Sequence, residues 1–266
     1  MAYADTTYLK AVNPNLSQGS ALLVYSIEDA ARYIDGRLAE KFGLPLSTVA
    51  AGLIVFGSNP SDGHTVTIGS KTYRFKGTTA QANDVTLAAT ALETCINLSL
   101  AINQRGTGWY STTTINEDIS ASYSATAASI TLTARRSGTL GNVLALSSAS
   151  AALTLTGFSG GAGDYPVLER INAWLASSYA TSGQVKSVLS SGGGGQDYIQ
   201  TMGDMAEVWI QKLLDDKMAL MDISGIQVTT SSAALPKSSN EGQAPFADVG
   251  DPVYWDYDSG QTWNRF

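Results

Sequence analysis

The sequence is poor in the residue types from which many enzyme sites are built. Cys95 is the only cysteine and His64 the only histidine in 266 residues. A disulfide within the chain needs two cysteines, and a zinc cluster or a histidine triad needs several such side chains. These counts therefore exclude an internal disulfide, a cysteine–histidine zinc site and any histidine triad.

Basic residues and long apolar runs are scarce as well. Lys and Arg number 16 against 23 Asp and Glu, and the resulting net charge of −7 argues against a DNA-binding domain that neutralises phosphates. The longest clear apolar run, Ala51–Phe56, is far too short to span a bilayer. The polar start, Met1–Lys10, does not resemble a signal peptide, so we expect synthesis in the cytoplasm and no membrane contact.

The motifs of common enzyme classes are missing too. No phosphate-binding loop, His-Glu-x-x-His, Gly-x-Ser-x-Gly or dinucleotide fingerprint is present, and Gly192–Gly195 is expected to be an ordinary loop. His64 lies in a turn ahead of a strand, where a solvent-facing role is usual. Cys95 has helical spacing with apolar neighbours, which favours a buried structural thiol. We expect no catalytic residue, no cofactor and no metal.

Two sets of acidic residues could be read as paired carboxylates for acid–base chemistry: Asp204 with Glu207, and Asp215 with Asp216 and Asp222. Their spacing along one amphipathic segment is more typical of a solvated helix face, which is the role we expect.

The stretch 26–46 predicts one amphipathic helix with a firm end. Ser26 is the expected N-cap, Gly43 is expected to close the helix in the left-handed conformation, and Pro45 prevents its continuation. Its apolar positions fall on one face: Ile27, Ala31, Ile34 and Leu38. This apolar stripe needs a partner from elsewhere in the chain.

Helical patterns return at both ends of the sequence. Asp5 and Asp164 are the expected N-caps of helices over residues 5–12 and 164–179, and a last helix covers about residues 197–222. The apolar face of the helix at 164–179 makes it the expected partner of the stripe at 26–46.

The composition of residues 50–163 is typical of strands and turns. Gly69-Ser70 separates strands at 65–68 and 71–76 in a predicted hairpin with a type II′ turn, whose buried face carries Val66, Ile68, Tyr73 and Phe75. A helix over residues 86–103 is expected to pack across this hairpin. Three later strands are predicted: 129–134, 143–147 and 153–156.

Two glycine-containing segments are read as connections. Arg135–Asn142 is expected to link the first two later strands, with Arg135-Arg136 at a hairpin tip, and Gly157–Gly163 is expected to be a flexible joint.

These patterns predict an α+β protein with a discontinuous helical core. The core comprises residues 1–49 and 164–223, a β-rich domain is inserted at 50–163, and residues 224–266 form an extended C-terminal arm. The segment 50–164 holds as many basic as acidic side chains, so the net negative charge lies on the rest of the chain.

The arm has an unusual end. After a stretch rich in Ser, Thr, Ala, Pro and Gly, five of the last thirteen residues are aromatic. Aromatic residues are common binding anchors, so we expect them to dock onto a partner or a neighbouring subunit, the alternative being a tail that folds back on its own core. The expected partner-binding residues are Tyr254, Trp255, Tyr257, Trp263 and Phe266.

The helical segments resemble the Mu-type head–tail adaptor proteins of tailed phages, also called connector or head-completion proteins. The resemblance rests on Tyr33–Leu38, on Phe42–Leu46, on the Pro-Val-Leu-Glu-Arg-Ile sequence at 166–171 and on a final helix with Trp209. In that family the Leu-Pro-Leu turn usually runs almost directly into the next helix. Here residues 50–163 intervene, and they are similar to β-rich inserts of phage neck and tail proteins.

The resemblance implies a structural virion protein without catalysis. Its subunits would form a ring, dodecameric in the family, below the portal protein and above neck or tail terminator proteins. The ring would continue the DNA channel without binding DNA specifically, and the aromatic arm would reach into the portal. The net negative helical part fits such a channel, because it favours sliding of the duplex over adhesion.

Two other classes of function are considered. A cell-wall hydrolase would need two convergent carboxylates, and the sequence offers no obvious pair. A surface-binding module of a phage tail would recognise host protein or carbohydrate through the β-rich domain, and it would need exposed aromatics, of which Trp109 and Tyr110 are the candidates.

Overall fold

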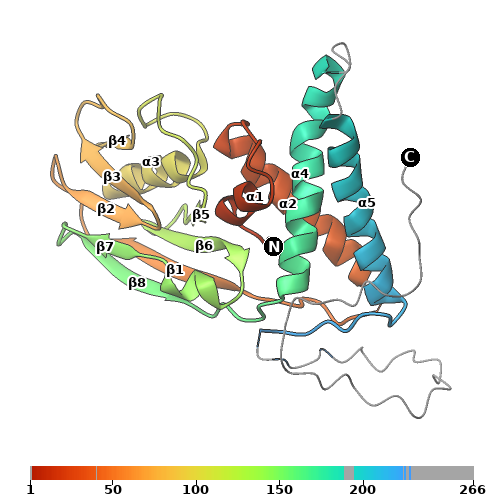
Figure 1. Cartoon of the computed structure of the whole chain (residues 1–266). Coiled ribbons are helices and arrows are strands. Elements are labelled where there is room, and N and C mark those ends of the chain that lie inside the picture. The colour runs from red at the N-terminus through yellow and green to blue at the C-terminus, as the bar shows by residue number, and fades with distance from the viewer. Residues whose placement is uncertain (1, 40, 189–194, 224, 226–227, 229–266) are drawn as a thin grey trace. The chain divides into compact units, whose positions relative to one another are not determined.

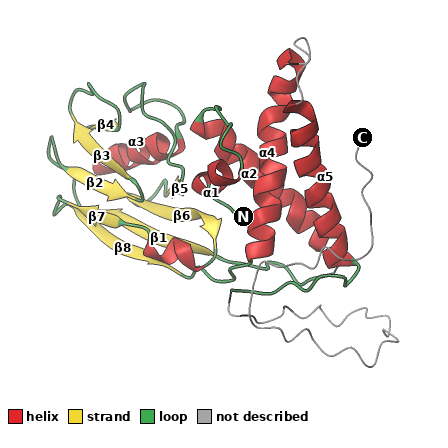
Figure 2. Cartoon of the chain, viewed as in Figure 1, coloured by secondary structure: helices red, strands yellow, loops and turns green. Residues whose placement is uncertain are grey.

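The computed structural model describes residues 2–39, 41–188, 195–223, 225 and 228. In this part of the chain helices and strands segregate, so the protein is α+β (Figure 2). Four of the helices form a helical layer, whereas two four-stranded sheets and helix α3 form a β layer (Figure 1). Both layers belong to one compact unit that spans Met1–Ser231.

The helical layer brings together the two ends of the described chain. Its members are α1 (Thr6–Val12), α2 (Ser20–Leu38), α4 (Pro166–Val188) and α5 (Gly195–Leu214). Helix α4 packs against all three others, and Trp174 of α4 meets Trp209 of α5 edge to face at 4.8 Å between ring centroids. The predicted pairing of the first long helix with the helix after Asp164 is confirmed, because both contribute to one buried core.

Helix α1 begins after Asp5, whose side chain accepts a hydrogen bond from the amide of Tyr8, as predicted. Helix α2 differs from expectation at both ends. It begins at Ser20, so Ser26 is a buried residue inside the helix and not its N-cap. Leu23 and Val24 extend the apolar periodicity towards the N-terminus, which explains the early start.

The end of α2 was also predicted incorrectly. The helix ends at Leu38, before Gly43, and Gly43 is not among the glycines with positive φ. The chain turns instead through residues 41–46, where the Leu44–Pro45 peptide is cis. The apolar stripe itself is confirmed: Ile27, Ala31, Ile34 and Leu38 are all buried.

The β layer contains two sheets that share one core with α3. The first sheet has the order β5-β6-β1-β8, with strands β5 (Ile119–Tyr123), β6 (Ser129–Ser137), β1 (Val49–Phe56) and β8 (Leu153–Ser159), all antiparallel. The second has the order β4-β3-β2-β7, with β4 (Asp84–Thr86), β3 (Lys71–Lys76), β2 (Thr65–Ile68) and β7 (Leu146–Ser148).

The β2–β3 hairpin confirms the sequence prediction. Ile68 pairs with Lys71 across Gly69-Ser70, and Gly69 has a φ of +61°, as the first position of a type II′ turn requires. Its predicted inner face is fully buried and contributes to the shared core: Val66, Ile68, Tyr73 and Phe75.

Three parts of the β layer were predicted incorrectly. Helix α3 (Ala91–Asn103) starts later than residue 86, because Thr90 and Glu93 form a reciprocal capping box and residues 84–86 form β4. Strand β6 continues through Arg135 and Arg136, so this pair does not lie at a hairpin tip. A short 3₁₀ helix, η1 (Thr139–Val143), follows it and occupies the expected start of the strand at 143–147, which is found instead at Leu146–Ser148.

Residues 157–163 are also more ordered than the expected flexible joint. Strand β8 includes residues up to Ser159, and Ala162 pairs with Thr48 in an antiparallel bridge. Gly161 packs so closely that a Cβ there would lie 2.3 Å from the carbonyl oxygen of Gly138. The segments that join the two layers therefore lie side by side and pair with each other.

Candidate functional site: the junction between the helical and β layers

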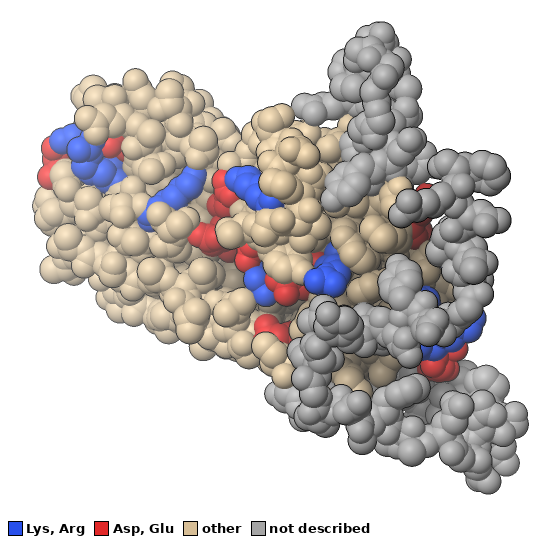
Figure 3. Space-filling view, in the orientation of Figure 1, with Lys and Arg blue, Asp and Glu red and all other residues tan. Residues whose placement is uncertain are grey.

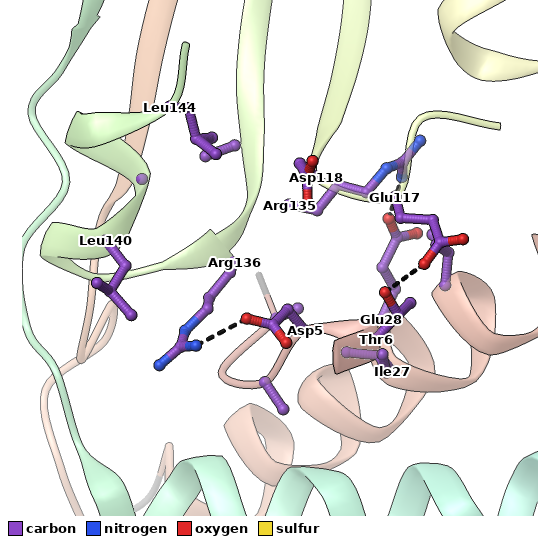
Figure 4. A pocket seen from close by; sticks show the side chains of 15 residues that line it. Asp5, Thr6, Ile27, Glu28, Glu117, Asp118, Arg135, Arg136, Leu140 and Leu144 are labelled. Carbon is purple, nitrogen blue, oxygen red and sulfur yellow. Dashed lines mark hydrogen bonds and ion pairs between the residues drawn. The ribbon is translucent and has the colours of Figure 1, made fainter. Parts of the chain in front are cut away.

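A cleft of about 70 Å³ lies where α1 and α2 meet strand β6 and η1. Figure 4 shows its lining, in which six residues are charged: Asp5, Glu28, Glu117, Asp118, Arg135 and Arg136. Figure 3 shows acidic and basic side chains gathered over this part of the molecule. The layers thus meet through a charged junction beside their two separate apolar cores.

Arg135 connects the end of β6 to helix α2. Its Nε donates hydrogen bonds to the carbonyl oxygens of Asn116 and Ile119, at 2.9 and 3.1 Å. Its guanidinium also forms an ion pair with Glu28. Only 9% of the Arg135 side chain is exposed, and such a planar donor fork suits a buried pairing of this kind.

Arg136 makes the second connection, to α1 and α4. Its Nη1 lies 2.8 Å from Oδ2 of Asp5, and its Nη2 lies 2.9 Å from Oε1 of Glu169 (Figure 4 shows the contact with Asp5). Burial raises the pKa of Glu169, and the nearby charges of Asp5 and Asp164 act in the same direction, whereas Arg136 and Arg170 oppose them. One guanidinium therefore joins β6 to two helices.

Glu117, in the loop before β5, lies at the N-termini of two helices. Its carboxylate accepts hydrogen bonds from the hydroxyl groups of Thr6 and Ser20, the first residues of α1 and α2. Helix α2 has no side-chain cap of its own, and a carboxylate is favoured at this positive end of the helix dipole. Burial opposes ionisation of Glu117, but these hydrogen bonds and two lysines outweigh it and hold its pKa below the ordinary value.

Backbone pairing adds a third type of contact. Ala2 forms a parallel bridge with Arg136, and the Ser137 amide donates to the Ala2 carbonyl at 2.7 Å. The buried side chain of Asn172 in α4 holds the same N-terminal segment, because its Oδ1 accepts from the amides of Tyr3 and Ala4 at 3.1 and 2.9 Å. Its Nδ2 donates to a carbonyl oxygen of α2 at 3.0 Å.

The carboxylate of Asp164 closes the junction next to α4. It accepts hydrogen bonds from the backbone amide and the hydroxyl group of Thr139 in η1. The predicted role of Asp164 as the cap of its own helix is thus replaced by a contact with the β layer. The Gly138 amide also donates to the carbonyl oxygen of Thr48, at 2.9 Å.

Each of the six charged residues that line the cleft has a partner within the protein. Asp118 accepts from the backbone and the hydroxyl group of Ser70, and the other five are paired as described above. An internally matched set of charges can hold two layers in register. The ion pairs and hydrogen bonds of the junction therefore link the two layers.

Other candidate residues lie apart from the junction. The Nδ1 of His64 lies 2.9 Å from the Ser150 hydroxyl oxygen, in a turn, and Cys95 is fully buried, which raises its pKa to about 12. Glu207 forms an ion pair with Arg37, whereas Asp215 and Asp216 pair with lysines.

Within the described ranges, no three His, Cys, Asp or Glu side chains are arranged to hold a metal ion. None of the helices described has the length and hydrophobicity needed to cross a membrane. The aromatic residues of the arm, Tyr254, Trp255, Tyr257, Trp263 and Phe266, lie outside the described residues. The loop residues Gly192–Gly194 do so as well.

Sequence reasoning missed most of the junction. Arg135-Arg136 was noticed as a basic pair, but Glu117 and Asn172 were not singled out. One signal was present for the pair: the alternation Ile130, Leu132, Ala134 continues to Arg136 and indicates one strand through Ser137.

No protein-family model matches the chain, and a search of curated proteins gave no match.

Proposed function

We propose that the protein is a structural subunit of a tailed-phage neck, in which a ring of such subunits connects the portal to the tail and continues the DNA channel. The observation that supports this proposal best is the junction, where every charged group of the cleft is paired internally. Such pairing suits a rigid building block, which must keep its shape under load, more than an enzyme.

The helical layer gives further support. Helices α2, α4 and α5 share one buried core, and the turn at residues 41–46 is tied back to the end of α5. There the Nζ of Lys41 donates to the carbonyl oxygens of Leu213 and Leu214 at 2.7 and 2.8 Å and pairs with Asp216. This places the Leu-Pro-Leu turn, on which the likeness to adaptor proteins rests, within a fixed helical framework.

The charge of the chain fits a channel that passes DNA. The net charge is −7, and residues 50–164 contribute nothing to it. A duplex is repelled weakly by such a wall and slides without specific binding. A ring whose lumen proved to be basic would contradict this part of the proposal.

The two candidate aromatic residues of the β layer do not favour the rival surface-binding function. Trp109 and Tyr110, the candidates for a recognition platform, are both half-buried. Trp109 packs against the core of the β layer, and its indole N–H donates to the carbonyl oxygen of Arg105 at 3.0 Å.

The proposal is tested by native mass spectrometry of the purified chain, alone and with the portal protein of its phage. We expect a closed ring of subunits, about twelve by analogy with the family, that forms on the portal. A version that ends at Ser239 tests the arm, and loss of ring formation on the portal is expected. A full-length chain that stays monomeric and ignores the portal would refute the proposal.

A further inference from the structure

A second groove, of about 120 Å³, lies beside the junction and has an apolar rim. Leu140 of η1 and Ile223, which follows α5, line it together with Tyr165 and Pro166 at the start of α4. Leu140 is 51% exposed and Ile223 is 73% exposed, and Val143, also on η1, is 78% exposed. Leu140 and Ile223 line the same groove, and exposed apolar side chains that lie together can form an interaction site. We call this feature the Leu140 groove.

The walls of the Leu140 groove are held in place by hydrogen bonds. The amide of Ile223 donates to the backbone carbonyl oxygen of Asp164 at 2.9 Å. The side-chain carboxylate of Asp164 accepts hydrogen bonds from the amide and the hydroxyl group of Thr139. Arg136 and Glu169, which are paired at 2.9 Å, also line the groove. The groove is therefore formed before any ligand arrives, as is usual for binding sites.

The chain itself carries a segment whose chemistry fits this groove. Residues 229–266 follow Ile223 closely in sequence, and five of the last thirteen residues are aromatic. Aromatic side chains that enter apolar pockets are typical anchors of protein interfaces. An extended chain spans about 3.3–3.6 Å per residue, so the stretch 229–253 is long enough to carry the aromatic end to a neighbouring subunit.

We propose that the aromatic end of one subunit's C-terminal segment occupies the Leu140 groove of the next subunit. This inference rests on the proposed ring. The contact joins two different surfaces of identical chains, and such a heterologous contact is the kind that closes a ring. It also gives the exposed apolar side chains of η1 and of residue 223 a partner.

The test is a cross-linking experiment on the full-length chain. A photoreactive benzoylphenylalanine replaces Trp263, and equal amounts of ¹⁴N- and ¹⁵N-labelled protein are mixed, assembled and irradiated. We expect cross-linked peptides that join the end of one chain to residues 139–143 or 165–166 of another, recognised by their mixed isotope composition. Cross-links confined to single chains, cross-links to other surfaces, or none at all would overturn the proposal.

Matched variants show whether the groove itself captures the segment. The double substitution Leu140→Ser and Ile223→Ser is expected to lower the mixed-isotope cross-links at least tenfold. Val208→Ser, which changes a 52% exposed apolar residue on α5 away from the groove, is expected to leave them unchanged. Circular dichroism verifies that each variant is folded. Equal cross-linking by the groove and control variants would refute the assignment.

Native mass spectrometry of the same samples separates this inference from the proposed function. If a ring forms on the portal but no cross-links to the groove are found, the docking of the C-terminal segment in the Leu140 groove is refuted and the proposed function is not. The absence of any ring would refute the proposed function as well.

Discussion

The junction predicts a large effect for Arg136→Met. The substitution keeps much of the side-chain volume but removes the partner of Asp5 and Glu169, whose side chains are 30% and 17% exposed. Breaking a buried ion pair costs about 3–5 kcal/mol and an exposed one costs about 0–1 kcal/mol. For these partly exposed carboxylates we expect a loss of about 2–4 kcal/mol in the free energy of unfolding, or roughly 5–15 °C in melting temperature.

The assay is chemical and thermal unfolding followed by circular dichroism, with Arg32→Met as the matched control. Arg32 pairs with Asp29 on the surface of α2, and their side chains are 68% and 57% exposed. The control is therefore expected to change stability by no more than about 0.5 kcal/mol. A double variant that also carries Glu169→Gln should recover part of the loss, because the stranded carboxylate is gone.

The same variant has a defined pH dependence. Burial already raises the pKa of Glu169 above its ordinary value of 4.5, and loss of Arg136 raises it further. The folded state then binds a proton that the unfolded state has released, so the variant loses stability as the pH rises above about 4.5. The difference from the wild type should shrink on acidification towards that pH. Equal stability of Arg136→Met and Arg32→Met at pH 7 would refute the account of the junction.

Three further predictions follow from single side chains. The pKa of Glu117 is lowered in the folded state, so its contribution to stability is complete above the ordinary value of 4.5 and is lost as the pH falls through the folded pKa. Glu117→Gln should therefore destabilise most at pH 7 and progressively less as the pH falls below 4.5, and a difference in unfolding free energy that does not change with pH would contradict this. Lys41→Met leaves two carbonyl oxygens at the end of α5 without their donor and should lower the free energy of unfolding in urea by about 1–3 kcal/mol. Lys41→Arg should lower it less, and equal stability of the two variants would count against the assigned contact. Cys95, whose pKa is raised to about 12 by burial, should not react with Ellman's reagent at pH 8 until the protein is unfolded, and fast labelling of the native protein would show that the core is misassigned.

Local patterns predicted the elements whose signals are short-range. The β2–β3 hairpin was predicted with its register and its buried face, because Gly69-Ser70 and the alternation of Val66 and Ile68 act within a few residues. The cap at Asp5 and the apolar stripe of α2 were predicted for the same reason. The division into a helical core and an inserted domain stays a prediction.

Tertiary contacts decided the elements that were predicted incorrectly. Ser26 looked like a cap, but Leu23 and Val24 also find burial in the helical core, so α2 extends past it. The first residue of α2, Ser20, donates a hydrogen bond to the carboxylate of Glu117, which lies far away in the sequence. No local pattern reveals this contact. Likewise, the local sequence suggested that Arg136 lies in a turn. It lies in β6, where it forms an ion pair with Asp5.

The junction could not be predicted because its members come from distant segments. Arg135 meets Glu28, and Asn172 meets the amides of Tyr3 and Ala4, at sequence separations of more than one hundred residues. A single sequence shows that these side chains are polar, but not that they share one interface.

The most direct test of the proposed function is a cryo-electron microscopy reconstruction of the phage particle to which we propose that the protein belongs. The account predicts a closed ring between portal and tail, into which the compact unit Met1–Ser231 fits as one body with Arg135 and Arg136 at the layer junction. Density for the protein at the tail tip or on the outer surface, with none in the neck, would contradict it and favour the surface-binding function.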